Sequence, residues 1–448
     1  MMNIHPIKKD RKRFWCLLGL LILLIMVRYA FQTDIPPVVF LLFIGLIVLL
    51  GDRDEVIAML ICCIPLHESV DFFYALAISV GIYVFKYHKL IKFSTNILLI
   101  FIVVVWELLH CFRTSFSPVD FLSGIVPFIV LAVIIASNTS QVDYPFIVRA
   151  FSWTALSVSL VLFMRVLYFS GFDFLLAIAG LQRIGLDPQS NVQDVTITGG
   201  LIHPTSLGII TVLAATGLMQ LRSAKVNKRS DMILLCIILL LAALGASRTY
   251  LACLAMMIVL LILAERGGAK KKLQLIAVLC LAIATATVAM AFLFPDTFEY
   301  FVSRFFEADI TTGRDSLMLL YHRFIADHPN VMFFGIGLQD FSNRLINVYR
   351  VANNVPHNSL QEIVVAWGVQ GLFLFGALIV SMLLASGRQN TKRSLINWIP
   401  LIIILFKSMA GQMLTSYYTM LAFSYAYLSL SADLTPKQSA LSNEVSDD

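Results

Sequence analysis

Charged residues are scarce in this chain. They make up 13% of its 448 residues, whereas hydrophobic residues reach 59%. An average globular protein has roughly 25% charged residues, and a soluble domain of this length could not cover its surface with about half that share. The composition therefore excludes a water-soluble enzyme and indicates a polytopic membrane protein.

Motifs for metals, nucleotides and nucleic acids are also missing. The seven cysteines lie in or beside apolar runs, without the spacing of a zinc site or of a disulfide framework. There is no Walker loop, dinucleotide fingerprint, nucleic-acid module or long internal repeat, and no acidic cluster of magnesium-binding type stands out. These absences predict a protein without a metal or other cofactor and without a nucleic-acid partner.

Apolar runs recur along the chain. A helix of about 20 residues crosses a hydrocarbon core of about 30 Å, so the runs predict an all-α polytopic bundle of about 12 to 14 transmembrane helices. The two runs between Val38 and Leu66 are shorter than the others. The predicted runs are residues 14–31, 38–50, 55–66, 70–85, 96–112, 121–137, 150–169, 197–221, 232–246, 249–264, 272–294, 358–384, 395–410 and 412–430.

One long polar segment interrupts this pattern. With this segment (295–357) read as a large helical extracytoplasmic loop, the sequence predicts three further parts. These are a bundle with short loops (1–294), C-terminal transmembrane helices (358–430) and a disordered cytoplasmic tail (431–448). With the amino terminus inside, every basic cluster falls on the cytoplasmic side, as the positive-inside rule requires. These clusters are Lys8–Arg13, Lys86–Lys92, Arg222–Arg229, Arg266–Lys272 and Arg388–Arg393.

In this topology the extracytoplasmic side carries arginines but no lysines. Of the 14 lysines, 13 are cytoplasmic and Lys407 lies within a span. Guanidinium groups bind phosphate or carboxylate through paired hydrogen bonds, so the outer arginines are candidates for such contacts. A general avoidance of lysine in exported loops would give the same pattern. The outer arginines are Arg113, Arg183, Arg248, Arg304, Arg314, Arg323, Arg344 and Arg350.

Arg314 is predicted to lie in the first turn of a helix that Thr312 caps and that runs to about Asp327. The helix dipole disfavours a cation there, whereas free backbone N–H groups and a guanidinium together form an anion site. Arg350 is a further candidate, because no acidic residue stands four positions away. The loop holds seven acidic residues and five arginines, so it is not basic overall. Its arginines would bind an anion through their individual positions and not through the net charge of the loop.

His357 ends the loop, just before the next span. Ser359 and Glu362 are spaced as a capping box, which places His357 ahead of a helix amino terminus. A neutral imidazole is favoured there and can accept a proton from a hydroxyl nucleophile. A histidine that only faces lipid headgroups is the alternative. His203, before Pro204, could line the same cavity, although a proline-capped helix start explains it equally well.

Residues 357–375, HNSLQEIVVAWGVQGLFLF, resemble the signature region of the O-antigen ligase and O-antigen polymerase superfamily. The resemblance lies in His357 and Asn358 at the end of the largest loop and in the glycines Gly368 and Gly371 of the following span. GASRTYLA, with Arg248, is similar to the family's serine-arginine turn, and TTGRDSL is similar to its loop arginine. The resemblance covers roughly residues 197–430.

The resemblance implies a metal-independent, inverting glycosyltransferase of the GT-C type in a bacterial plasma membrane. Its donor and acceptor would be glycans linked to undecaprenyl pyrophosphate, and a flippase and a chain-length regulator would be partners beside the membrane lipids. Arg248 and Arg314 become pyrophosphate contacts and His357 the candidate base. Arg350, His203 and Asn358 are further candidates for substrate binding.

Three functions stay open. A polymerase adds repeat units to lipid-linked glycan, whereas an O-antigen ligase transfers the glycan to a lipid A core, and the motifs do not separate them. We favour the polymerase because the loop is of modest size. A lipid-linked glycan flippase or other transporter is the alternative of another class, for which repeats and broken helices in matching positions are expected. Three cations in or near spans, Arg28, Arg165 and Lys407, are expected to extend to the headgroups, and contact with the pyrophosphate is the alternative for each.

Overall fold

The protein was analysed as a computed structural model that describes residues 11–67, 72–112, 118–137, 142–170, 202–243, 247–265, 268–293, 314–338, 358–390, 394–409 and 417–432, with a few single positions between them. In these ranges the secondary structure is helical, apart from an isolated β-bridge between Ile91 and Ser137. The all-α prediction is therefore confirmed for the described residues.

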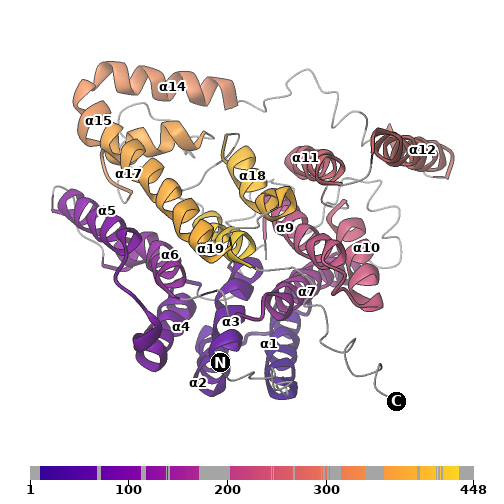
Figure 1. Ribbon diagram of the computed structural model, residues 1–448, viewed down its shortest axis with the longest axis horizontal. Helices are drawn as coiled ribbons and strands as arrows, with labels where there is room; N and C mark the ends of the chain where they lie inside the picture. Colours follow the sequence, from indigo (N-terminus) through magenta and orange to yellow (C-terminus); the bar gives the residue numbers. More distant parts are fainter. Residues whose placement is uncertain are drawn as a thin grey trace, which may run out of the picture.

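The helices follow the apolar runs of the sequence (Figure 1). Each predicted run overlaps a helix, with ends displaced by up to seven residues. The helices are α1 (Lys12–Ala30), α2 (Pro37–Leu50), α3 (Arg53–Leu66), α4 (Phe72–Tyr87), α5 (Thr95–Cys111), α6 (Pro118–Ala136), α7 (Tyr144–Ser170), α9 (Pro204–Ser223), α10 (Arg229–Ala243), α11 (Arg248–Ala264), α12 (Ala269–Leu293), α14 (Arg314–Asp327), α15 (Pro329–Phe334), α17 (Ser359–Gln389), α18 (Leu395–Met409) and α19 (Tyr417–Ser431).

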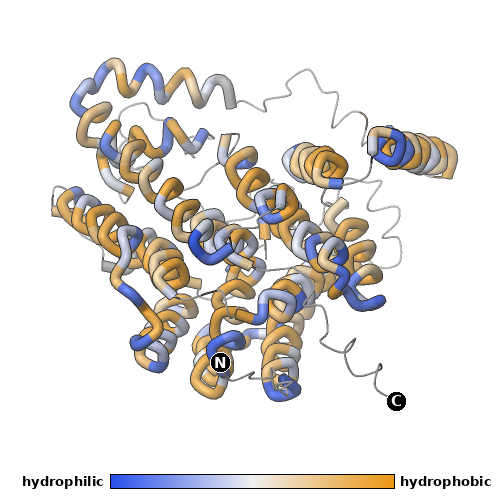
Figure 2. The backbone as a smooth tube through the Cα atoms, in the orientation of Figure 1, coloured by the Kyte–Doolittle hydropathy of each residue, from blue (hydrophilic) through white to orange (hydrophobic). Residues whose placement is uncertain are grey.

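Four helices in the described ranges are long and apolar enough to cross a membrane: α1, Tyr144–Arg165 within α7, Thr205–Ser223 within α9, and α17. Several shorter helices, among them α2, α5, α11 and α18, are also apolar. Hydrophobic residues cover the helix bodies in Figure 2, and hydrophilic residues concentrate at helix ends and on α14. Membrane association by helices is the property that these lengths and compositions support.

Several threonine hydroxyl groups inside the apolar helices bond within their own helix. Thr154 donates to the Ala150 carbonyl (2.8 Å), Thr211 to Leu207 (2.9 Å) and Thr216 to Val212 (2.8 Å). A polar group in a hydrocarbon-like interior must find a partner, and the carbonyl four residues earlier is the nearest one. The helices can therefore carry these side chains without a polar neighbour.

Hydrogen bonds join several helix ends on one side of the bundle, and we call this side the Arg11 end. Arg11, before α1, bonds Asp54 of α3 (3.0 Å) and Asp143 before α7 (3.2 Å). Arg149 of α7 bonds Asp231 of α10 (3.1 Å). The described parts of the basic clusters lie here too: Lys86 donates to the Leu49 carbonyl at the end of α2, and Lys272 to the Leu263 carbonyl at the end of α11.

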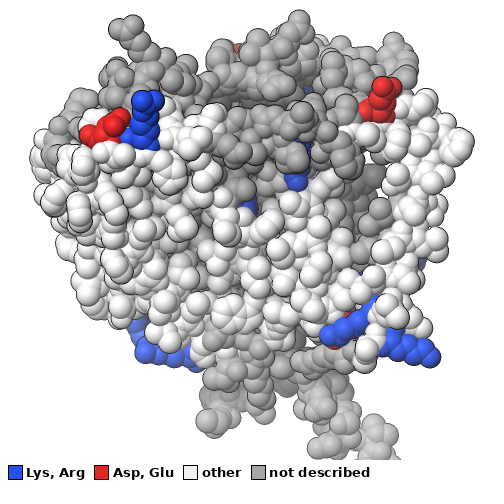
Figure 3. Space-filling view, turned by 90° about the horizontal axis from the view of Figure 1, so that it is seen from above, with Lys and Arg blue, Asp and Glu red and all other residues white. Residues whose placement is uncertain are grey.

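The opposite helix ends meet at what we call the Arg248 end. The start of α9 contacts the start of α11, and the start of α17 bonds the segment between α18 and α19. Between the two ends, Figure 3 shows a broad band in which nearly all visible side chains are uncharged, with lysines and arginines along the lower edge and charges of both signs at the upper edge. The candidate residues of the sequence that the structure describes, Arg248, His203, Arg314 and Asn358, lie at helix starts.

Candidate functional site

Arg248 is the first residue of α11, and its side chain is half-buried. Ser247 caps this helix: its Oγ accepts a hydrogen bond from the Tyr250 backbone N–H (3.3 Å). The same Oγ lies 3.5 Å from Oγ1 of Thr205, in the first turn of α9. The serine of the predicted serine-arginine turn therefore fixes Arg248 beside the start of a second helix.

A close contact one turn further along holds these helices together. A Cβ atom at Gly208 of α9 would lie 2.6 Å from the Cβ of Tyr250 in α11. The Tyr250 side chain is buried and its hydroxyl donates to the Leu239 carbonyl of α10 (2.9 Å). Only glycine permits this approach, so Gly208 sets the distance between the starts of α9 and α11.

His203 occupies the amino-terminal cap of α9. Its Nδ1 accepts a hydrogen bond from the Thr205 backbone N–H (3.2 Å), and Pro204 follows as the first helical residue. An imidazole that accepts at Nδ1 in its neutral form carries its hydrogen on Nε2. The exposed His203 ring is thus a neutral cap that can donate from Nε2 to an anion at the helix start.

Asn358, and not Ser359, caps α17. Its Oδ1 accepts hydrogen bonds from the backbone N–H groups of Leu360 (3.0 Å) and Gln361 (3.2 Å). The capping box predicted from Ser359 and Glu362 is wrong, because both side chains bond a distant segment. Ser359 Oγ donates to the Gly411 carbonyl (2.9 Å), and Glu362 Oε2 accepts from the Leu414 N–H (3.0 Å).

Arg314 begins α14, as the sequence predicted, so it lies in the first turn of a helix. Figure 1 shows α14 lying across the upper part of the view, beyond α17 and α18. The Gln361 side chain of α17 donates to the Met318 carbonyl of α14 (3.0 Å). Burial, together with the nearby Glu362 carboxylate, raises the pKa of the Tyr321 phenol on α14. The two helices that carry Arg314 and Asn358 are therefore packed together.

Lys407 is a residue whose place the sequence did not predict. It was expected to extend to the headgroups, but it is only 4% exposed, and Arg165, with the same expectation, is 6% exposed. Lys407 donates to Thr419 Oγ1 (3.0 Å), and its Nζ lies 5.2 Å from the centre of the Tyr418 ring. A lysine inside an apolar run is itself a signal of a buried polar site, because a charge facing lipid is costly.

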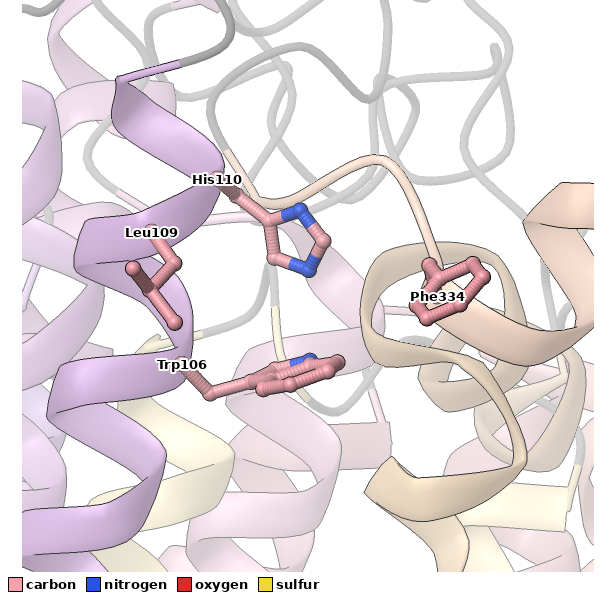
Figure 4. Close-up of a pocket in the computed structure, with 4 residues that line it drawn as sticks. All are labelled: Trp106, Leu109, His110 and Phe334. Carbon is pink, nitrogen blue, oxygen red and sulfur yellow. The ribbon is translucent and has the colours of Figure 1, made fainter.

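A small cavity lies elsewhere at the Arg248 end, between α5 and α15. It has a volume of about 250 Å³ and is lined by Trp106, Leu109, His110 and Phe334 (Figure 4). The Trp106 ring forms its floor, and the His110 ring faces it from above. Figure 1 separates α5 and α15 clearly from α9 and α11. This largely apolar cavity is therefore distinct from the surroundings of Arg248.

His110 and its neighbour Glu107 are buried, at 5% and 1% exposed. Two other candidates of the sequence, His357 and Arg350, lie outside the described residues. Within the described ranges, no three His, Cys, Asp or Glu side chains come together as metal ligands would.

The common property of the described candidates is their position at helix starts. Arg248 and Arg314 are first residues, and His203 and Asn358 are caps. Each helix start carries the positive end of the helix dipole, on the side to which its first backbone N–H groups point. Placing arginine there adds positive charge to positive charge, which favours an anionic ligand.

Comparison with models of known protein families gives no match, and comparison with curated proteins gives none either.

Proposed function

We propose that the protein is an integral-membrane glycosyltransferase that polymerises oligosaccharide repeat units carried on undecaprenyl pyrophosphate. The product would be an O-antigen, capsular or extracellular polysaccharide. In this proposal the chain crosses a bacterial plasma membrane about 12 to 14 times, and the Arg248 end faces outward. The proposal rests on the resemblance of the sequence to the O-antigen polymerase and ligase superfamily and on the chemistry of the helix starts.

The junction of α9 and α11 is the observation that carries the proposal. It places the half-buried residue Arg248 directly after Ser247, whose Oγ lies 3.5 Å from Thr205 Oγ1 at the start of a second helix, at one end of an apolar helical bundle. An anion attached to a membrane lipid would reach this end with its head group while its chain stays in the bilayer. A pyrophosphate has enough oxygen atoms to accept from a guanidinium and from backbone N–H groups together.

The reaction itself requires stabilisation of a leaving group. The acceptor hydroxyl attacks the anomeric carbon of the donor sugar, its proton passes to a base, and the bond from that carbon to the pyrophosphate oxygen breaks. Negative charge then builds on the pyrophosphate, and prearranged donors lower the barrier most where this charge develops. We assign that role to Arg248 and Arg314, and we assign the base to His357.

Replacing Arg248 or Arg314 with lysine tests the donor site. Lysine keeps the charge but not the two parallel N–H groups, so we expect polymerisation to fall by about tenfold to a hundredfold in each variant. The measurement is the rate of glycan elongation from purified lipid-linked repeat units, with each protein at equal amount.

Arg323 provides the matched control, because it is an exposed arginine on the same helix as Arg314. Arg323→Lys should leave the rate unchanged. Full activity in both Arg248→Lys and Arg314→Lys would contradict the proposed donor site.

The outward orientation is tested by thiol labelling. Asn343 belongs to the loop that the topology puts outside, so Asn343→Cys should react with a membrane-impermeant maleimide in whole cells, after permeabilisation of any outer membrane. Ser223→Cys at the exposed end of α9 should react only after the plasma membrane is opened. The unaltered chain measures any reaction of its native cysteines. Labelling in the opposite order would show that the topology is inverted.

A transporter is the alternative from another class, and one observation bears on it. Helix α17 is broken at Gly368, where φ is 72°, and broken helices often line the substrate sites of transporters. The Val365 and Ala366 carbonyls before this break accept hydrogen bonds from the backbone of Ile336 and Gly337. Because these carbonyls already accept hydrogen bonds from the chain itself, they do not bind a transported substrate. The break therefore supports docking of the segment after α15 and not transport. The ligase differs from the polymerase only in its acceptor, and an assay with lipid A core distinguishes them.

A further inference from the structure

A segment from earlier in the chain supplies the hydrogen bonds that the break in α17 leaves unmade. In a continuous helix the Val365 and Ala366 carbonyls would accept from the backbone four residues later. Here they accept from the N–H groups of Ile336 (2.9 Å) and Gly337 (2.8 Å), which follow α15. Buried carbonyls need partners, so the turn of residues 335–338 replaces the missing helical hydrogen bonds.

The turn lies directly against both helices that flank it. Gly335 and Gly337 have φ angles of 71° and 84°, a region that favours glycine. A Cβ at Gly335 would lie 2.3 Å from the Ala366 carbonyl oxygen of α17, and one at Gly337 would lie 2.8 Å from the His110 Cβ of α5. The turn therefore has no room to shift between α5 and α17.

Glu107 of α5 joins the same two segments with one carboxylate. Its Oε1 accepts from the Leu338 backbone N–H (2.9 Å), and its Oε2 accepts from the Trp367 indole N–H (2.8 Å). Both partners can only donate, so both carboxylate oxygens must accept, which the ionised form does. Glu107 and Trp367 are each 1% exposed, and a buried charge persists only where such bonds compensate its desolvation.

Each of these bonds holds a segment that begins with a candidate residue of the proposed site. Leu338 ends the arm formed by α14 and α15, which starts at Arg314. Trp367 ends the first half of α17, which Asn358 caps. The bond from Gln361 to Met318 links α17 to α14 nearer their starts. A carboxylate on α5 thus sets the position of α14 relative to the first half of α17.

We propose that Glu107 is a positioning residue, which holds Arg314 and the Asn358 cap in one arrangement by bonding Leu338 and Trp367 together. This role in polymerisation rests on the proposed function. Glu107 does not contact the lipid-linked glycan in this proposal. It acts only through the two segments that it joins, and α11, with Arg248, does not depend on it.

Glu107→Gln is the informative substitution. An amide has one acceptor and one donor group, so it can accept from Leu338 or from Trp367, but its NH₂ group then faces the other donor. We expect kcat for elongation to fall about tenfold or more, with KM for the lipid-linked donor changed less than about threefold, because Arg248 is untouched. Glu107→Asp keeps two acceptor oxygens and should recover part of kcat.

The Trp367→Phe background gives a test that does not use activity. It removes the indole donor, so Glu107→Gln no longer opposes two donors. Hydrogen exchange at the Leu338 amide should then rise much less on Glu107→Gln than it does in the unaltered chain, where we expect about a tenfold increase. Trp106→Phe is the matched control, because it deletes an indole N–H that has no hydrogen-bond partner among the described residues.

Two results would overturn the proposal: unchanged exchange and kcat in Glu107→Gln, or an equal effect of Glu107→Gln in the Trp367→Phe and Trp106→Phe backgrounds. Failure of the proposed function is a separate outcome. It would appear as full activity of Arg248→Lys and Arg314→Lys, while exchange at Leu338 still responds to Glu107→Gln.

Discussion

Replacing His357 with alanine is expected to stop chain growth while donor binding persists. In the proposed function, binding of the lipid-linked donor would rest on arginines, whereas activation of the acceptor hydroxyl would rest on the imidazole of His357, the residue directly before the Asn358 cap of α17. A positioned base contributes about 10² to 10⁴ in rate, so single repeat units should accumulate on the lipid carrier. Gel analysis of lipid-linked glycan, in cells with the variant at wild-type protein level, measures this.

Long glycan chains at normal yield in His357→Ala would contradict this assignment. The base would then be sought at His203 or His322, whose side chains are both exposed. Glu362, in the first turn of α17, is 0% exposed and its carboxylate already accepts from the Leu414 N–H. His203→Ala and His322→Ala, measured beside His357→Ala, decide among the three histidines.

Replacing Gly368 with alanine is expected to lower the stability of the protein strongly. Its backbone, at φ 72° and ψ −172°, lies in a region that is essentially restricted to glycine. A Cβ there would also lie 2.2 Å from the Phe333 carbonyl oxygen of α15. The backbone strain alone costs about 1–3 kcal/mol. The thermal unfolding midpoint in detergent should fall, together with the amount of protein in the membrane.

Gly376 is the matched control in the same helix. A Cβ there meets no atom within 4 Å, and alanine is favoured over glycine inside a helix by about 1 kcal/mol. Gly376→Ala should therefore leave the unfolding midpoint unchanged or raise it. Equal midpoints for Gly368→Ala and Gly376→Ala would show that α17 is continuous through Gly368.

The positions of the helices could be predicted from the sequence, because apolar length alone marks a helix in this composition. The run predicted at residues 395–410, for example, is α18, Leu395–Met409. The break at Gly368 could not be predicted this way. The apolar run continues through it, and the groups that stabilise the break come from Ile336 and Gly337, about thirty residues earlier.

The cap of α17 shows the same limit at the candidate site. Ser359 and Glu362 fit a local capping box, yet they bond Gly411 and Leu414, which lie 52 residues later in each case. Local patterns predicted that the helix starts here, but not which side chain would cap it. Arg314 was correctly placed in the first turn of a helix. The serine-arginine turn that the resemblance indicated around Arg248 is the start of α11. The expectation that Lys407 reaches the headgroups was wrong because it assumed a helix surface in lipid, whereas α18 packs Lys407 against Thr419.

The break in α17 also separates a part of the helix that neighbouring segments hold in place from a part that exposes apolar side chains. Residues 359–367 are held by α5, α14, the turn after α15 and the segment after α18. The part after Gly368 exposes large hydrophobic side chains, with Phe373 at 74% and Leu384 at 62%. A bilayer that thickens or thins tilts the helices that face it. Such a tilt would be taken up at Gly368, so the Asn358 cap would keep its position in membranes of different thickness.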